Sequence, residues 1–530
     1  MRNTTHFNGL VQVTTALLSF VALSRAFSKL SYLPHPNPIK SFWLHPPSAN
    51  PLRESGSAGE LTSGADVCII GSGLTGVGTA WHLVNQLGSG EAETKKKIVV
   101  LDAREFCSGA TGRNGGHLTP AVFSGFREQE RLHGTDEARR SHHIERHTSN
   151  ALLKFIKDNS LESDVDLFEG GHLGVFRGAD EEAAGKADWE AARKAGVDMG
   201  GPDGEGDVRW IGTEELVQKY GVNPDLNYTA VWFNAHNLWP SKLVTKLFLD
   251  VQNQRAGGAE VVLHTKTPVT SISKLDAERW SLHTPRGDIA CNYVVHATNA
   301  YTGHLLPFLR GDNLDIQDIT DITDVTQFPL SLRPRGYYGI TPTRGQIGAV
   351  RASVDSEGLG WHNSWGTGAR AWQYWFPRYQ DVKSDAGHRP LIVLGGGRNQ
   401  MERGTTDDSI LDSQVEKALK AFLPWLFPKQ FIEEDAEEAW EMEWTGIMGY
   451  TSTGEPLVGP VRPLGHRSRL PAENPYEGQY IAAGFSGHGM PRTFSCAEAV
   501  AGMIAAKIRG KEWTTPDWLP RRYLTWATEP

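Results

Sequence analysis

The stretch that decides the fold is Val67–Leu83, VCIIGSGLTGVGTAWHL, in which four apolar residues run directly into three glycines spaced G-x-G-x-x-G. The apolar run predicts a buried strand, and the residues after the glycines have the periodicity of a helix. A second strand is predicted at Lys95–Ala103, KKKIVVLDA. Strand, glycine turn, helix and strand form a βαβ unit, which closes with a right-handed crossover into a parallel sheet.

The glycine turn indicates a site for a pyrophosphate. Gly71, Gly73 and Gly76 let the chain turn tightly, approach the phosphates and pack the helix on the strand. The helix that begins near Leu74 directs free N–H groups and the positive end of its dipole at the anion. Asp102 ends the second strand, where a carboxylate can accept hydrogen bonds from both ribose hydroxyls. The combination predicts an adenine dinucleotide, either FAD or NAD.

The continuation Ala103–Pro120, AREFCSGATGRNGGHLTP, separates the two cofactors. A chain that binds NAD would continue into another regular βαβ element. This chain instead enters a loop of small residues, Gly109–Gly112 and Asn114–Gly116, around one arginine. Backbone without bulky side chains can lie against a pyrophosphate and then against a flat ring system. The loop favours FAD, and an ordinary surface loop is the alternative.

Seven segments together resemble the D-amino-acid-oxidase-like family of FAD-dependent oxidoreductases. They are DVCIIGSGLTGVGTAWHL, VVLDAREFCSGATGRNGGH, VVHATNAYTGHLLP, TPTRGQ, LIVLGGGR, WTGIMGYTSTGEPLVGP and YIAAGFSGHGM. The sequence looks most like the branch that contains γ-glutamylputrescine and sarcosine oxidoreductases, and PNPIKSFWL, Pro36–Leu44, looks like the arm of fungal members. The resemblance implies an α/β plus α+β fold, with a Rossmann-like FAD-binding domain interleaved with an antiparallel-sheet substrate domain.

The resemblance also implies domain boundaries. Residues 31–64 are expected to form an irregular N-terminal arm, and residues 511–530 a C-terminal tail. The FAD-binding domain is expected at 65–160, 240–310 and 440–510, and the substrate domain at 161–239 and 311–439.

The residues that the resemblance implies for FAD binding lie in the first glycine turn, after the second strand, in the small-residue loop, beside the adenine and in a last glycine turn. They are Gly71, Ser72, Gly73, Leu74, Thr75, Gly76, Asp102, Ala103, Arg104, Ala110, Thr111, Asn114, Gly115, Gly116, Val269, Gly484, Gly487, His488, Gly489 and Met490. The cysteine and histidine that tether flavin in some relatives are absent here, so the FAD is expected to be non-covalent.

His117, Tyr450 and Arg344 are expected near the chemistry, with Arg378 as the alternative to Arg344. His117 and Tyr450 would flank the reactive end of the flavin, and Arg344 or Arg378 would bind a substrate carboxylate, with a structural ion pair as the alternative for either arginine. Four neighbouring tryptophans could form a cage for an amine by cation–π contact, or could fill the core. These tryptophans are Trp361, Trp365, Trp372 and Trp375.

The resemblance implies oxidation of a C–N bond of an amine or amino acid to an imine. Oxygen is the expected electron acceptor, although a dehydrogenase stays open. The alternatives are a tailoring oxidoreductase that acts on a secondary-metabolite intermediate and, in another class, a non-catalytic flavin-binding protein. The formal charge of −9 over 530 residues, without a basic block, argues against a nucleic-acid partner. Cys68, Cys107, Cys291 and Cys496 lie far apart, which predicts neither a disulfide framework nor a zinc or other metal site.

Residues 1–30 are expected to be a secretory signal peptide. Arg2 precedes the apolar Leu10–Ser24, which is too short to span a bilayer comfortably, and small residues suited to cleavage follow. A membrane-anchoring helix and a spurious extension are the alternatives. We therefore expect a secreted or lumenal protein without stable membrane insertion, with the cytoplasm as the alternative. Asn227-Tyr228-Thr229 is a glycosylation sequon that is usable only if the chain is secreted.

Overall fold

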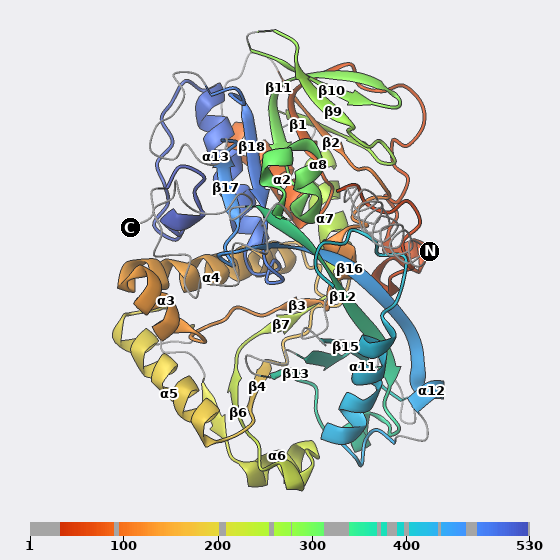
Figure 1. Cartoon of the computed structure of the whole chain (residues 1–530), viewed down its shortest axis with the longest axis vertical. Coiled ribbons are helices and arrows are strands. Elements are labelled where there is room, and N and C mark those ends of the chain that lie inside the picture. Colours follow the sequence, from red (N-terminus) through yellow and green to blue (C-terminus); the bar gives the residue numbers. More distant parts are fainter. Residues whose placement is uncertain are drawn as a thin grey trace, which may run out of the picture.

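The computed structural model of the chain describes most residues from Tyr32 onward. The described ranges are 32–88, 95–200, 208–253, 259–276, 278–311, 339–367, 373–378, 389–396, 402–432, 436–462 and 474–527. The expected signal peptide and Trp372 lie outside these ranges. Figure 1 shows two sheets toward opposite ends of the molecule, with α4 between them and the long strands β12 and β16 on the side of the second sheet nearest the first.

The first sheet is the expected Rossmann-like unit. Its main path runs β17-β18-β11-β1-β2-β8, and β10 and β9 extend it from β11. The strands β8, β2, β1, β11 and β18 are parallel neighbours, and β17 joins the edge antiparallel. The bounds are β1 Gly64–Ile70, β2 Lys96–Leu101, β8 Ala259–His264, β9 Ser271–Lys274, β10 Trp280–Thr284, β11 Gly287–His296, β17 Leu457–Pro460 and β18 Gln479–Ala483.

Helices pack on this sheet because their apolar stripes bury against it. The largest core cluster joins β1 and β2 to α2, α7, α4 and α13. The bounds are α2 Leu74–Leu87, α4 Thr135–Asp158, α7 Pro240–Asn253 and α13 Thr493–Ile508. The expected C-terminal tail is tied to this domain, since Leu519 and Tyr523 are fully buried in the same cluster.

The second sheet belongs to the expected substrate domain and runs β16-β12-β15-β14-β13-β4-β6-β5. All its pairs are antiparallel except β13 with β4. The bounds are β4 His172–Phe176, β5 Arg209–Ile211, β6 Thr229–Phe233, β12 Ile340–Arg351, β13 Ser364–Thr367, β14 Tyr374–Pro377, β15 Leu391–Gly396 and β16 Trp440–Thr451. A short two-stranded ribbon and four helices complete this part. The ribbon pairs β3 His117–Leu118 with β7 His236–Asn237, and the helices are α3 Phe126–His133, α5 Ala179–Lys194, α6 Thr213–Tyr220 and α11 Ser413–Leu426.

Two expectations are corrected here. The sequence boundary places residue 440 onward in the FAD-binding domain, but β16 pairs with β12 along its whole length and so belongs to the substrate sheet. The spacing of the cysteines predicts no disulfide, yet Cys68 and Cys291 form one, with their Cα atoms 6.0 Å apart. The reason is topological, because β1 and β11 are neighbours in the parallel sheet although 223 residues separate the two cysteines.

The tryptophan cluster is core packing. Trp361, Trp365 and Trp375 are each at most 1% exposed, and they pack on one another and on Phe427 of the substrate-domain core. Since no face of these rings is open to a ligand, these three tryptophans do not form an amine cage.

Candidate flavin site

The first glycine turn has the geometry of a phosphate cradle. Gly71 has φ +113°, and a Cβ there would lie 2.6 Å from the carbonyl oxygen of Ala297. A Cβ at Gly76 would collide with the carbonyl of Gly71, so only glycine lets α2 pack this close to β1. Gly73 caps α2 without a side-chain hydrogen bond. Apart from that of Leu74, which donates to the Thr111 hydroxyl, the N–H groups of the first turn are therefore available to an anion, which fits the pyrophosphate of FAD.

Asp102 joins this turn to the chain that follows β2. Its Oδ2 accepts hydrogen bonds from the backbone N and the hydroxyl of Ser72, at 2.9 and 2.5 Å, and its Oδ1 accepts one from Arg104 N at 2.9 Å. A carboxylate offers about four acceptor sites, so capacity remains for a ribose hydroxyl. Thr267 N donates to the Asp102 carbonyl at 2.8 Å, which brings the buried Val269 to the same strand ends.

The small-residue loop, Ser108–Gly116, lies against the start of α2. Its middle forms the short helix η3, Ala110–Arg113. The hydroxyl of Thr111 accepts a hydrogen bond from Leu74 N at 3.1 Å, and Ser41 from the N-terminal arm donates to the carbonyl of Gly112 at 2.5 Å. Two segments that the sequence predicts to bind one cofactor are thus in contact.

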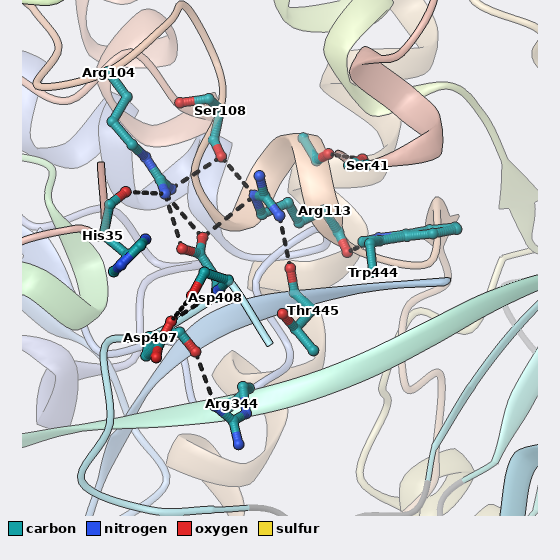
Figure 2. Close-up of polar contacts among 12 residues, drawn as sticks. His35, Ser41, Arg104, Ser108, Arg113, Arg344, Asp407, Asp408, Trp444 and Thr445 are labelled. Carbon is teal, nitrogen blue, oxygen red and sulfur yellow. Dashed lines mark hydrogen bonds and ion pairs between the residues drawn. The ribbon is translucent and has the colours of Figure 1, made fainter. Parts of the chain in front are cut away.

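A buried charge cluster that the sequence did not reveal holds this loop (Figure 2). The Asp408 carboxylate, from the substrate domain, lies 2.9 Å from Arg104 Nη1 and 3.5 Å from Arg113 Nε. Both arginines also donate to the Ser108 carbonyl, and Arg113 donates to the Thr445 carbonyl of β16 at 2.8 Å. All three charged side chains are at most 8% exposed. The cluster therefore ties the loop Ser108–Gly116, called the flavin loop below, to the substrate sheet.

The last glycine turn, Gly484–Met490, is held from two sides. Asn299 Oδ1 accepts a hydrogen bond from Gly484 N at 2.9 Å. On the other side Glu145 of α4, which is 1% exposed, lies 3.0 Å from His488 Nε2 and 2.8 Å from Arg492 Nε. Burial would raise the pKa of Glu145, but His488 and Arg492 hold that pKa well below its usual value. The His488 side chain therefore contacts the Glu145 carboxylate.

The N-cap residue of the helix after this turn also makes no side-chain cap hydrogen bond, although Thr148 Oγ1 accepts one from Ser495 N at 3.3 Å. α13 begins at Thr493, its N-cap Arg492 makes no side-chain cap hydrogen bond, and the Thr493 hydroxyl is buried without a partner among the described residues. The positive end of the helix dipole stabilises negative charge, as a reduced flavin ring would carry. This end of the site also fits FAD.

The register of β12 and β16 decides which candidate side chains share a face. Directly opposite residues in an antiparallel pair point to the same side, and sides alternate along a strand. Tyr450 lies opposite Thr341, and Arg344 lies opposite Ile447. Three positions separate Thr341 from Arg344. Tyr450 and Arg344 therefore point to opposite faces of the sheet.

His117 lies on the face of Tyr450. Its ring centroid is 5.2 Å from that of Tyr374 and 5.1 Å from that of Phe376. Phe376 of β14 lies opposite Val393 of β15, which lies opposite Ala349 of β12. Eight positions separate Ala349 from Thr341, so both side chains point to the same face, and Phe376 therefore lies on the face of Tyr450. His117 and Tyr450 thus share a face of the sheet on which Arg344 does not lie. They are not neighbours on it, because Tyr374 beside His117 is level with Ile347, six residues or about 20 Å along β12 from Thr341.

Tyr374 and His172 are site residues that sequence reasoning missed. The Tyr374 ring occupies a slot between Gly115 and Gly395, where a side chain on either glycine would collide with it. His172 lies beside His117, with ring centroids 6.1 Å apart, and its Nδ1 is 2.9 Å from the Ser364 hydroxyl. The glycines in LIVLGGGR and GRNGGH indicate that a bulky group lies against the backbone there. The spacing of the sequence does not indicate that this group is the side chain of Tyr374.

Burial keeps the two histidines neutral. It lowers the pKa of His117 to about 4 and, together with the nearby His117, lowers that of His172 to about 3. Nδ1 of His117 lies 3.0 Å from the Gly115 carbonyl oxygen, which fixes the ring against the flavin loop. The hydroxyl of Tyr450 is buried without a partner among the described residues. This face therefore offers uncharged polar groups in an apolar setting.

Both candidate arginines are committed to internal partners. Arg344 Nη2 lies 2.5 Å from Glu402 Oε2, and its Nη1 donates to the Asp407 carbonyl at 3.1 Å (Figure 2). Arg378 donates to Asp166 at 2.9 Å, and its guanidinium lies 4.4 Å from the ring centroid of Trp239. Each arginine therefore makes the structural ion pair that the sequence analysis gave as the alternative to binding a substrate carboxylate.

Within the described part of the chain, no group of three or more His, Cys, Asp or Glu side chains could hold a metal ion. Nor does any helix of the described ranges have the length and apolar character needed to cross a membrane.

Comparison with known proteins agrees with this geometry. Residues 66–503 match the family model described as DAO, FAD dependent oxidoreductase. A probable oxidoreductase OrdL of Rhizobium meliloti is 26% identical over 243 residues, 46% of this chain and 51% of the relative. The gamma-glutamylputrescine oxidoreductase of Escherichia coli is 39% identical over 74 residues, 14% of this chain and 16% of that protein. The chain therefore matches about half or less of the length of these curated relatives.

Solved structures share the fold. Glycine oxidase from Geobacillus kaustophilus superposes with a TM-score of 0.58 at 19% identity, over 86% of this chain and 97% of that chain. L-amino acid deaminase from Proteus myxofaciens superposes with a TM-score of 0.59 at 12% identity, over 93% of this chain and 99% of that chain. At these identities the likeness shows the fold alone. Because the family match spans residues 66–503, the chain belongs to the DAO family of FAD-dependent oxidoreductases.

Proposed function

We propose that this enzyme oxidises the C–N bond of an amine or amino acid to an imine, which then hydrolyses to a carbonyl compound. The observation that carries the proposal is the face of the substrate sheet that packs on the flavin loop through Trp444 and Arg113. It carries Tyr450, whose buried hydroxyl has no partner among the described residues, and, farther along, His117 and Tyr374. FAD, when bound, supplies the hydride acceptor for the carbon that bears the nitrogen. The names of the relatives, which include glycine oxidase and gamma-glutamylputrescine oxidoreductase, support the same class of substrate.

The neutral histidines support oxidation of an amine in particular. The desolvation that lowers the pKa of His117 and His172 would also lower the pKa of a substrate ammonium group at the same place. An amine that loses its proton on entry has the free electron pair that assists departure of a hydride. Tyr374 would form the wall of the site beside His117, and the Tyr450 hydroxyl, farther along the same face, would orient another part of the substrate by a hydrogen bond.

The bound FAD would rest on the uncapped start of α2, on Asp102 and on the loop around Thr111. We propose that it is not covalently attached. Gly446–Gly449 contains no cysteine, and Cys107, directly before the flavin loop, is fully buried, with its thiol pKa raised by that burial. A thiolate is the nucleophile in such a linkage, so this sulfur is poorly suited to form one.

One series of measurements on the purified protein tests the proposal. Acid precipitation should release the yellow cofactor into the supernatant. Anaerobic addition of a panel of primary amines, secondary amines and amino acids should bleach the flavin with at least one class, and air should restore the colour and yield hydrogen peroxide if oxygen is the acceptor. A flavin spectrum that no member of the panel bleaches would contradict the proposed reaction. Bleaching that air does not reverse would contradict oxygen as acceptor.

A further inference from the structure

We infer that this chain matures in an oxidising secretory compartment, where Asn227 receives an N-linked glycan and Cys68 and Cys291 are oxidised to their disulfide. The inference does not depend on the substrate of the enzyme. It rests on three separate features: the disulfide, an accessible sequon and the composition of the first 30 residues.

The disulfide lies where its closure must accompany folding. Cys68 in β1 and Cys291 in β11 are both 0% exposed, and they pack among apolar residues such as Val99, Trp280 and Leu282. A reagent in solution cannot reach this site once the sheet has formed. Disulfides of this kind form in the oxidising compartments of the cell and are rare in the reducing cytosol. The other two cysteines, Cys107 and Cys496, are buried and free.

The sequon Asn227-Tyr228-Thr229 lies at an exposed turn. Asn227 follows the short helix η4, Pro224–Leu226, in the left-handed conformation with φ +50°, and its side chain is exposed. Asparagine tolerates this conformation better than most residues. Tyr228 is 9% exposed and anchors the turn, so a sugar on Asn227 would point into solvent without disturbing the core.

A glycan at this turn would also leave the flavin site open. Asn227 lies between α6 and β6, which Figure 1 shows at the far end of the molecule from β1, β2 and the start of α2. A second sequon, Asn3-Thr4-Thr5, falls inside the segment expected to be removed as a signal peptide. Asn227 is therefore the position at which we place the modification.

Both chemical steps use reagents of that compartment. In the first, the bond between the anomeric carbon of a lipid-diphosphate-linked oligosaccharide and its phosphate oxygen breaks. A bond from that carbon to Asn227 Nδ2 forms, the amide loses one proton, and the lipid diphosphate leaves with the electron pair. In the second, the two thiols give two protons and two electrons to the disulfide of a thiol oxidoreductase, which becomes a dithiol.

The glycan is tested by expressing the full chain in yeast with its own N-terminus. Thr229→Ser keeps the hydroxyl that the sequon requires, whereas Thr229→Val removes it at nearly the same shape. We expect endoglycosidase to increase the gel mobility of the wild type and of Thr229→Ser, and to leave Thr229→Val unchanged. Attachment precedes folding, so an unstable variant remains informative. A wild-type chain whose mobility the enzyme does not change would overturn the glycan at Asn227.

The disulfide is tested on the same wild-type protein by N-ethylmaleimide labelling in denaturant, followed by peptide mass analysis. Without reductant we expect label on Cys107 and Cys496 alone, and after reduction on all four cysteines. Cys68→Ser should then expose Cys291 to the label without reductant. Labelling of all four cysteines before reduction would overturn the disulfide, even if the glycan is present.

Discussion

The Asp408 carboxylate accepts hydrogen bonds from Arg104 Nη1 at 3.0 Å and 2.9 Å, although 304 residues separate the two side chains in the chain. Arg113, on the flavin loop, contributes a second positive charge to the same carboxylate. Burial lowers the pKa of Arg113 to about 10, even though Asp408 opposes that shift, so both arginines remain charged at neutral pH. One aspartate of the substrate domain therefore holds the loop on which the flavin is expected to lie.

Replacement of Asp408 by Asn should cost about 3–5 kcal/mol of unfolding free energy, because it leaves two buried guanidinium groups without their counter-charge. The affinity for FAD should fall as well, since the loop loses its anchor. Unfolding in urea and FAD titration of the apoprotein measure the two effects.

Asp407→Asn is the matched control for this change. Its side chain accepts hydrogen bonds from Ser409 and does not contact either arginine of the cluster. If Asp408→Asn and Asp407→Asn lose equal stability, the cluster is not what holds the loop.

Asp102→Asn should weaken FAD binding by roughly 1–3 kcal/mol, the scale for loss of hydrogen bonds to a charged group. The carboxylate both orders Ser72 and offers remaining acceptor capacity to the ribose. Asp66→Asn is the control, because Asp66 lies at the opposite end of β1 and binds Lys96 and Lys97 N. Dissociation constants from flavin fluorescence distinguish the two. Equal affinity in both variants would refute the ribose assignment.

Local sequence predicted the elements whose partners are close along the chain. The βαβ unit from Val67 to Ala103 follows from apolar periodicity and glycine placement, and the structure confirms it. The loop conformation of Ser108–Gly116 was also predictable, because its small residues follow one another in the sequence. The family match confirms FAD as the cofactor that these segments indicated.

Contacts that depend on register or on distant pairing could not be predicted in this way. The face on which Arg344 lies depends on alternation along β12, and a shift of one residue would have moved it to the other side. The partner of Arg104 is 304 residues away, and Cys68 and Cys291 meet only because β1 and β11 are adjacent. Spacing in the sequence carries no information about such pairs.

Buried neutral histidines should make the protein sensitive to acid. The pKa of His172 is lowered in the folded state, so below about pH 6.5 the unfolded chain binds a proton that the folded chain does not. Stability should therefore fall as the pH decreases from about 6.5 to about 3, by on the order of 5 kcal/mol for this residue. His172→Gln should flatten the slope of unfolding free energy against pH in that window.

Tyr450→Phe should lower turnover while leaving the flavin bound. The hydroxyl is buried and makes no hydrogen bond with a described residue, so its expected partner is the substrate. Its removal should raise the activation free energy by roughly 1–2 kcal/mol, the scale for one hydrogen bond. Rapid anaerobic mixing measures the rate of flavin reduction. An unchanged rate, with full flavin occupancy, would remove Tyr450 from the reaction.

Arg344→Gln should affect carboxylated and simple amine substrates alike. The guanidinium is held by Glu402 and the Asp407 carbonyl and lies on the face of the sheet opposite Tyr450, so its expected role is to fix the segment that carries Asp408. An ion pair with a substrate carboxylate would instead be worth about 2–5 kcal/mol when buried, which is more than tenfold in kcat/KM for carboxylated substrates only. The ratio of kcat/KM between an amino acid and the matching amine measures the difference. Arg351→Gln, on the same strand, controls for general disturbance of β12. A selective loss with the carboxylated substrate would place Arg344 in the substrate site after all.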